Sequence, residues 1–239
     1  MACFLIMPSA QRIARTGQFQ VTVAAIEDLS PRMRRITLAS SELAEHDWPL
    51  ACDIAIVLAG EDGREVRRRY TVRSTSEVSL VVDAVLHGHG PGSTWAAGLT
   101  VGDEITFFGP RGEVPVADAD WLLALTDEAG LPAIAALAEA VSPRLLTVYA
   151  EVADGEDRYP FGANVDVRWL SRGDIDAGGT ALLSGAIDSF QPPKGHGYAY
   201  VLGESRAIVS LRDQLASIGL SRNDVYAKGY WNLQSRPTR

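Results

Sequence analysis

Hydrophobic and polar residues alternate along the first half of the chain. The segments 19–25, 53–59, 78–87 and 104–108 each place apolar side chains at every second position. A period of two is typical of strands with one buried face. Turn residues separate these segments, and one short helix is expected among them, at 93–99. The pattern therefore predicts an antiparallel Greek-key sheet closed into a barrel.

The pattern changes near residue 118. Residues 121–126 form a continuous apolar run, as in a strand buried on both faces. Residues 132–141 follow the helical period, and Pro132 suits a first turn. We expect further strands at 144–152, 165–170, 198–203 and 224–231, and further helices at 180–187 and 206–219. This alternation predicts a parallel sheet covered by helices.

These two patterns predict a barrel domain at 17–117 and an α/β domain at 118–239, joined by a linker at 116–120. Ligands of open α/β sheets bind beyond the carboxyl ends of the strands. The expected ends are 126–132, 151–160, 171–173, 202–205 and 228–231. Because the barrel would supply a second ligand, the arrangement suits an electron-transfer flavoenzyme, in which two ligands meet between the domains.

The formal net charge of -8 over 239 residues argues against nucleic acid or an anionic membrane as the main partner. Cys3 and Cys52 form no CxxC pair, which favours a reduced cytoplasmic protein. The apolar N-terminal run lacks a basic region and is too short for a signal peptide. The longest apolar region, 121–141, contains charged residues, so we expect no membrane span.

Against this acidic background, the sequence RRRYTVR (67–73) concentrates positive charge. In a strand, Arg68 and Tyr70 share a face, where an arginine fork can bind a pyrophosphate and a ring can lie on a flavin. Thr71 reaches the same flavin only if the ring edge overlaps a bend in the strand. Arg73 adds a second charge. A solvated barrel face would also explain several arginines in one strand.

The sequence HGHGPGSTW (87–95) offers bare backbone N–H groups at the start of a helix, where an anion is favoured. Ser93 and Thr94 add hydroxyl donors. The segment is not a P-loop, because no lysine precedes the Ser-Thr pair. His87 and His89 are weak candidates for a metal site because no further ligands accompany them, and a plain turn is the simpler interpretation.

The order of several motifs resembles that of the siderophore-interacting protein family, a branch of the ferredoxin-reductase-like flavoproteins. The motifs are LSPRMRRITL (29–38), RRYTVR (68–73), VDAVLHGHGPGSTWA (82–96), GDEITFFGPRG (102–112), TDEAGLPAI (126–134) and GYW (229–231). Single motifs recur in other flavoproteins, so the resemblance depends on their order and spacing.

The resemblance implies an FAD-binding barrel, an NAD(P)H-binding-like second domain and reduction of ferric siderophores in the cytoplasm. It implies that Arg68 and Arg73 serve the FAD phosphates, that Tyr70 lies on the isoalloxazine ring and that Thr71 reaches its N5 edge. The other implied cofactor-binding residues are Val72, Asp83, Leu86, His87, Gly92, Ser93, Thr94 and Trp95 in the barrel and Asp127, Glu128, Ala129, Tyr230 and Trp231 in the second domain.

Two departures from the family pattern fall in the second domain. Ala129 stands where the family commonly has threonine, and Asn232 stands where an arginine usually follows Gly-Tyr-Trp. They concern nicotinamide binding more than flavin binding. The chemistry belongs mostly to the cofactor, so we expect no catalytic acid, base or nucleophile in the protein.

A ferric siderophore is the expected substrate, and anionic chelates need local positive charge. Lys194 and Lys228 are the only lysines, and Lys228, with Lys194 or Arg158, is the candidate for lining the chelate pocket. Both lysines could equally be solubilising surface residues. Two other functions stay open: a flavin oxidoreductase fed by a ferredoxin-like protein, and a non-catalytic protein that binds flavin or siderophore.

Overall fold

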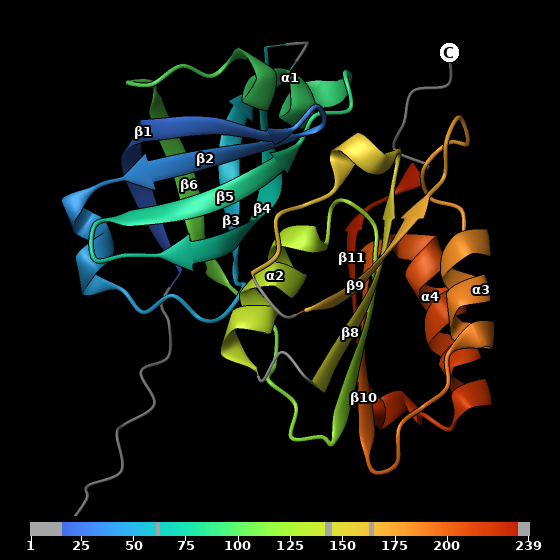
Figure 1. The fold of residues 1–239 in the computed structure, drawn as a ribbon. Helices are drawn as coiled ribbons and strands as arrows, with labels where there is room; N and C mark the ends of the chain where they lie inside the picture. The colour runs from blue at the N-terminus through green and yellow to red at the C-terminus, as the bar shows by residue number, and fades with distance from the viewer. Residues whose placement is uncertain (1–15, 61–62, 142–144, 163–164, 234–239) are drawn as a thin grey trace, which may run out of the picture.

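The computed structural model describes residues 16–60, 63–141, 145–162 and 165–233, so Cys3 and the apolar N-terminal run lie outside the described residues. Its first half is a closed antiparallel barrel (Figure 1). The strands are β1 (Gly17–Ser30), β2 (Met33–Ala39), β3 (Asp53–Ala59), β4 (Glu65–Thr75), β5 (Ser79–Val85) and β6 (Glu104–Arg111). They are ordered β1-β2-β5-β4-β3-β6, which confirms the predicted Greek-key barrel.

The period-two pattern produces the barrel core. Phe19, Val21 and Val23 of β1 point inward, as do Ile54 and Ile56 of β3, and all five are buried. A 3-10 helix (Ser41–Glu45) and the helix α1 (Gly90–Gly98) join barrel strands. The helix α1 begins three residues earlier than predicted, because a proline is well accommodated in a first helical turn, where its missing N–H costs nothing.

The second half is a five-stranded parallel sheet ordered β11-β10-β7-β8-β9, as predicted. Its strands are β7 (Trp121–Thr126), β8 (Leu146–Val152), β9 (Asp166–Ser171), β10 (Gly197–Glu204) and β11 (Val225–Trp231). Its helices are α2 (Leu131–Ala140), α3 (Ala181–Ser189) and α4 (Ser205–Gln214), with 3-10 turns at Gly155–Asp157, Leu215–Ile218 and Arg222–Asp224. The predicted helix at 206–219 therefore ends as a 3-10 turn, closed by Gly219 at φ 89°.

Helices cover both faces of this sheet. The helix α2 lies on the face toward the barrel, and α3 and α4 lie on the opposite face (Figure 1). All six residues of β7 are buried, as expected for a central strand covered on both sides. The core beneath α2 also takes in Met33, Ala51 and Val114, so an apolar contact joins the barrel to the second half.

Candidate functional site

Arg68 and Tyr70 of β4 lie beside the turn that begins α1, and we call these two residues and Gly92 the cradle. The Tyr70 hydroxyl donates a hydrogen bond to the Gly92 carbonyl oxygen at 3.1 Å. A Cβ atom on Gly92 would lie 2.9 Å from the Tyr70 hydroxyl oxygen and 3.5 Å from Arg68 Cγ. Both side chains therefore face α1, and only glycine leaves them room.

The first turn of α1 completes the cradle with backbone donors. No side chain caps this turn. The Ser93 hydroxyl points backward and accepts hydrogen bonds from the N–H groups of His87 (3.0 Å) and Gly88 (3.1 Å), which holds the glycine-rich turn in shape. The exposed Arg68 guanidinium donates to the Arg67 carbonyl oxygen at 3.0 Å. An arginine beside an uncapped helix N-terminus suits a phosphate.

Aromatic rings flank the cradle. The Trp95 ring lies 5.2 Å from the Tyr70 ring, measured between centroids, while Thr94 is exposed. The His87 and His89 rings lie 4.3 Å apart. Within the described ranges, no three His, Cys, Asp or Glu side chains are grouped so that they could hold a metal ion.

Two buried hydroxyl groups face each other where β4 meets β11. The Thr71 and Tyr230 hydroxyl oxygens are buried, and neither makes a hydrogen bond with the described part of the chain. Burial raises the pKa of Tyr230, whereas the nearby Thr71 hydroxyl lowers it. A buried hydroxyl without a partner is costly, so a ligand edge that offers hydrogen-bonding atoms would be stabilised here.

We use the term domain seam for the contact between the barrel and the second half of the chain. Arg73 lies in this seam, where its guanidinium binds the Glu139 carboxylate of α2 and donates to the Tyr159 hydroxyl at 3.2 Å. Asp83 binds Arg35 through two hydrogen bonds of 2.8 and 2.9 Å and accepts another from Tyr159. These contacts of Arg73 and Asp83 serve domain docking, and their expected roles toward a cofactor stay predictions.

Val72 and Leu86, two further residues expected to bind the cofactor, make backbone hydrogen bonds. The Val72 N–H donates to the Cys52 carbonyl oxygen at 2.8 Å, and the Leu86 N–H donates to the Arg32 carbonyl oxygen at 2.8 Å. Val72 is buried in the barrel core, and Leu86 packs against it. Both residues thus belong to the barrel core, against which Tyr70 also packs.

The three basic residues expected near a substrate do not come together. Lys228 Nζ lies 2.8 Å from Asp53 Oδ1 across the domain seam and 4.9 Å from the centroid of the Tyr230 ring. Lys194 is exposed and precedes the start of β10, at the amino edge of the parallel sheet. Arg158 is exposed in the loop after β8. Only Lys228 therefore lies next to Tyr230.

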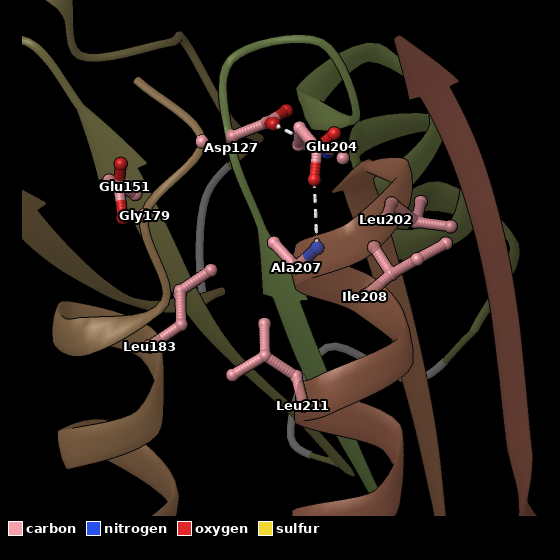
Figure 2. Close-up of a pocket in the computed structure, with 11 residues that line it drawn as sticks. Asp127, Glu151, Gly179, Leu183, Leu202, Glu204, Ala207, Ile208 and Leu211 are labelled. Carbon is pink, nitrogen blue, oxygen red and sulfur yellow. Dashed lines mark hydrogen bonds between the residues drawn. The ribbon is translucent and has the colours of Figure 1, made fainter. Parts of the chain in front are cut away.

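A pocket opens at the carboxyl edge of the parallel sheet, between α3 and α4 (Figure 2). The carboxyl groups of Asp127, Glu151 and Glu204 line its upper part, and Leu183 and Leu211 line its lower part. The strand order reverses between β7 and β10 at this edge. Open α/β sheets bind ligands at such a reversal, so the pocket is the candidate nucleotide site of this half.

Asp127 connects three elements at the pocket. Its carboxylate accepts hydrogen bonds from the N–H groups of Ala129 (2.9 Å) and Glu204 (3.0 Å) and from Trp231 Nε1 (2.8 Å). Burial raises the pKa of Asp127 to about 6, the Trp231 hydrogen bond opposes the rise, and Glu128 adds to it. Asp127 thus fixes the aromatic end of β11 against the carboxyl edge.

A buried ion-pair cluster adjoins the pocket. Arg172, which directly follows β9, lies 2.7 Å from Glu128 and 3.6 Å from Glu151. Burial raises the pKa of Glu151 to about 7, against the lowering effect of Arg172. The chain segments that carry these residues were expected at strand ends, but Glu151, Arg172 and Glu204 were not singled out. A charged residue directly after an apolar strand is the signal that could have found them.

The barrel and the second half both match models of known families. Residues 51–114 match the siderophore-interacting FAD-binding domain, and residues 119–234 match the siderophore-interacting protein model. A crystal structure of a siderophore utilization protein from T. fusca has a TM-score of 0.84 and 29% identity, over 94% of this chain and 96% of that chain. A barrel joined to a parallel sheet in this way defines the class of ferredoxin-reductase-like proteins.

Curated proteins with similar sequences are also found. The NADPH-dependent ferric-chelate reductase of Escherichia coli is 25% identical over 94% of this chain and 97% of its own length. An uncharacterized protein of Mycobacterium tuberculosis is 35% identical, but the match covers 59% of this chain and only 55% of that relative. The chain therefore spans about half the length of the mycobacterial relatives that it matches.

These findings show that the chain belongs to the siderophore-interacting protein family. Its cofactor is FAD, and NAD(P)H as the electron donor is consistent with the family. The comparisons do not support a ferredoxin-like donor. Across the ranges that the structure describes, no helix is long and apolar enough to cross a membrane.

Proposed function

We propose that this chain is an FAD-dependent oxidoreductase that uses NAD(P)H to reduce the iron of ferric siderophores. One observation carries the proposal: the cradle lies beside a buried, unpartnered Thr71 hydroxyl at the domain seam. A flavin on Tyr70 with its reactive edge at Thr71 would face the second half of the chain, from which a donor would approach. The name of the Escherichia coli relative supports the same reaction.

The residues present fit FAD at the cradle. Arg68 and the uncapped first turn of α1 would bind its pyrophosphate, and the missing Cβ of Gly92 lets the backbone approach. Tyr70 would support the isoalloxazine ring, and the Thr71 hydroxyl would donate a hydrogen bond at the ring edge. Tyr230 would cover the ring from the second domain. These roles follow from position and hydrogen-bonding capacity.

When bound, FAD would supply the redox chemistry, which is acceptance of a hydride from NAD(P)H and transfer of one electron to each of two ferric ions. The chain's own residues bind, orient and shield. Tyr70 and Tyr230 would restrict the ring to one plane, and the Lys228–Asp53 pair would hold Tyr230 in place. This mechanism requires no acid, base or nucleophile from the protein.

We further propose the boundary between the two functional domains, 17–117 and 118–239, which falls between β6 and β7. The second domain would present the nicotinamide donor at the carboxyl edge, where Asp127, Glu128, Ala129 and Trp231 lie. A ferric chelate would approach Tyr230 through the seam, near Lys228. Lys194 lies at the opposite edge of the sheet, so we assign it to the solvated surface.

The proposal is tested by a steady-state assay with NADH or NADPH, a ferric hydroxamate or catecholate chelate, and a chromogenic ferrous chelator. Two ferrous ions should form for each NAD(P)H consumed, and the reaction should require bound FAD. Omitting the chelate and omitting the protein are the controls. If the FAD-loaded protein forms no ferrous iron with either donor, the proposed function is wrong.

A further inference from the structure

The loop that follows β8 crosses the domain seam and contacts the barrel at two points. At the first, Arg32 in the turn between β1 and β2 lies 3.1 Å from Asp154 and also binds Asp157. At the second lies Tyr159, which is 3% exposed and packs in the core on the barrel side of the parallel sheet. Because ligands of such sheets bind beyond the carboxyl ends of the strands, these contacts attach the expected donor edge to the barrel.

The Tyr159 hydroxyl joins three strands of the barrel. It donates a hydrogen bond to the Asp83 carboxylate of β5 and accepts others from Arg35 Nη2 of β2 (3.0 Å) and Arg73 Nε of β4 (3.2 Å). Burial and the Asp83 carboxylate raise the pKa of Tyr159, so the hydroxyl keeps its proton and stays a donor. Hydrogen bonds to charged groups are stronger than those between neutral groups, so this hydroxyl is firmly held.

Two of these three strands also carry the cradle. Arg73 follows Tyr70 by three residues in β4, at an irregularity in the pairing of β4 with β5. An irregularity of this kind redirects a side chain, and Arg73 reaches α2 in the second half of the chain. The strand β5 runs into the glycine-rich turn that carries Gly92. The Tyr159 hydroxyl therefore connects the strands of the cradle with the second half of the chain.

We propose that Tyr159 is a positioning residue for electron transfer. Its hydroxyl holds the cradle and the carboxyl edge of the parallel sheet in the alignment that hydride transfer needs, without touching FAD or the donor. This inference rests on the proposed function. Hydride transfer requires the reacting atoms to be close and aligned, and a displacement of about 1 Å can slow a reaction by about a hundredfold.

Removal of the hydroxyl alone leaves the charged groups around it paired. In Tyr159→Phe, Asp83 keeps its two hydrogen bonds from Arg35, at 2.8 and 2.9 Å. Arg73 keeps the Glu139 carboxylate, at 3.0 Å. The variant should therefore fold, with the loop after β8 held less firmly against the barrel.

Tyr149→Phe is the matched control. Tyr149 is 4% exposed, and its hydroxyl accepts a hydrogen bond from Arg168 at 2.6 Å, so both variants remove a hydroxyl that binds an arginine. Tyr149 packs in the core on the opposite face of the parallel sheet, away from the barrel. A purely structural role would lower the stability of both variants and leave electron transfer unchanged in both.

The first test is anaerobic stopped-flow reduction of bound FAD by whichever of NADH and NADPH reduces the wild type faster. In Tyr159→Phe the limiting rate at saturating donor should fall about tenfold, while the dissociation constant of the donor and the FAD content stay within about twofold. Dithionite, which needs no donor site, should bleach all three proteins equally fast. Tyr149→Phe should keep the wild-type limiting rate.

Three results would overturn the inference. One is a limiting rate in Tyr159→Phe within about twofold of the wild type. Another is an equal loss in Tyr149→Phe, which would assign the effect to stability. The third is a donor dissociation constant that rises more than about twofold in Tyr159→Phe, which would make Tyr159 part of the donor site.

Hydrogen exchange of the FAD-loaded proteins separates this inference from the proposed function. The Asp157 and Phe161 N–H groups donate to the Asp154 and Tyr159 carbonyl oxygens at 3.3 and 3.0 Å. Both amides should exchange about tenfold faster in Tyr159→Phe and at the wild-type rate in Tyr149→Phe. Unchanged exchange in Tyr159→Phe overturns the inference alone. If dithionite bleaches wild-type FAD but neither dinucleotide does, the donor part of the proposed function fails, and the inference fails with it.

Discussion

At Gly92, a single missing side chain decides whether the cradle can form. An alanine Cβ there would lie 2.9 Å from the Tyr70 hydroxyl oxygen, closer than van der Waals contact permits, so Tyr70 would have to shift. We expect Gly92→Ala to weaken FAD retention about tenfold or more. Gly98→Ala, in the same helix, adds a Cβ that meets nothing within 4 Å and should retain FAD normally. Equal flavin content in the two purified variants would contradict the position of Tyr70.

The directions in which the side chains of β4 point give a second prediction about single residues. Arg68 lies next to Gly92, whereas Arg67 points away and lies 4.1 Å over the Phe108 ring. Arg68→Ala should lose a charge-assisted hydrogen bond to the FAD phosphates, which is worth about 1.5–3 kcal/mol, and release FAD readily. Arg67→Ala should retain FAD. Fluorescence titration of FAD into both apoproteins measures the difference, and similar dissociation constants would refute the assigned facing.

Glu151 should also make stability depend on pH. Its folded-state pKa of about 7 lies above the ordinary value of 4.5, so the native state binds the proton more tightly than the unfolded state. The stability that this proton provides is present below about pH 4.5 and is lost as the pH rises through 7. The free energy of unfolding of Glu151→Gln relative to wild type should therefore rise by about 1–3 kcal/mol from pH 5 to pH 8. Denaturant titrations measure it, and a constant difference would contradict a buried Glu151 carboxylate with a raised pKa.

At the same scale, the sequence alone predicted those side-chain orientations that depend only on the periodicity of one strand. The shared face of Arg68 and Tyr70 follows from the period of two in β4. The partners of Lys228 and Arg73 did not follow, because Asp53 and Glu139 lie 175 and 66 residues away along the chain. Ionic partners so far apart are brought together only by the way the two domains dock.

At the scale of elements, the pair formed by Lys228 of β11 and Asp53 of β3 joins the domains. Its side chains are 20% and 9% exposed, so removing one partner leaves a largely buried charge. Lys228→Met should lower the free energy of unfolding by about 2 kcal/mol, and the Asp53→Asn, Lys228→Met double variant should lose less than the sum of the singles. Lys194→Met, the exposed control, should be nearly neutral. Strict additivity in the double-mutant cycle would show that the pair contributes nothing.

Most elements could be predicted because their patterns are local. The continuous apolar run of β7 and the alternation in β3 each specify one kind of burial. The ends of elements were less predictable. The strand β1 runs from Gly17 to Ser30, longer than the expected 19–25, because it pairs with β2 along one end and β6 along the other. Pairing of this kind depends on strands far away in the sequence.

At the scale of the whole molecule, one candidate site lies beside the seam, and the other lies across the parallel sheet from it. Thr71, the neighbour of Tyr70 in β4, lies near Tyr230, and the acidic pocket lies at the carboxyl edge of the second sheet (Figure 2). Two ion pairs join the two halves, Arg73–Glu139 and Lys228–Asp53. Docking therefore sets the distance between a donor bound to the second domain and FAD bound to the barrel.

The central claim is that FAD in this seam transfers electrons from a nicotinamide to ferric iron. The most direct measurement is an anaerobic absorption titration of the purified, FAD-loaded protein, first with NADH and then with a ferric chelate. We predict that one NADH bleaches each flavin and that two equivalents of ferric chelate restore its absorbance. A flavin that stays oxidised with both NADH and NADPH, or a bleached flavin that ferric chelate does not reoxidise, would contradict the account.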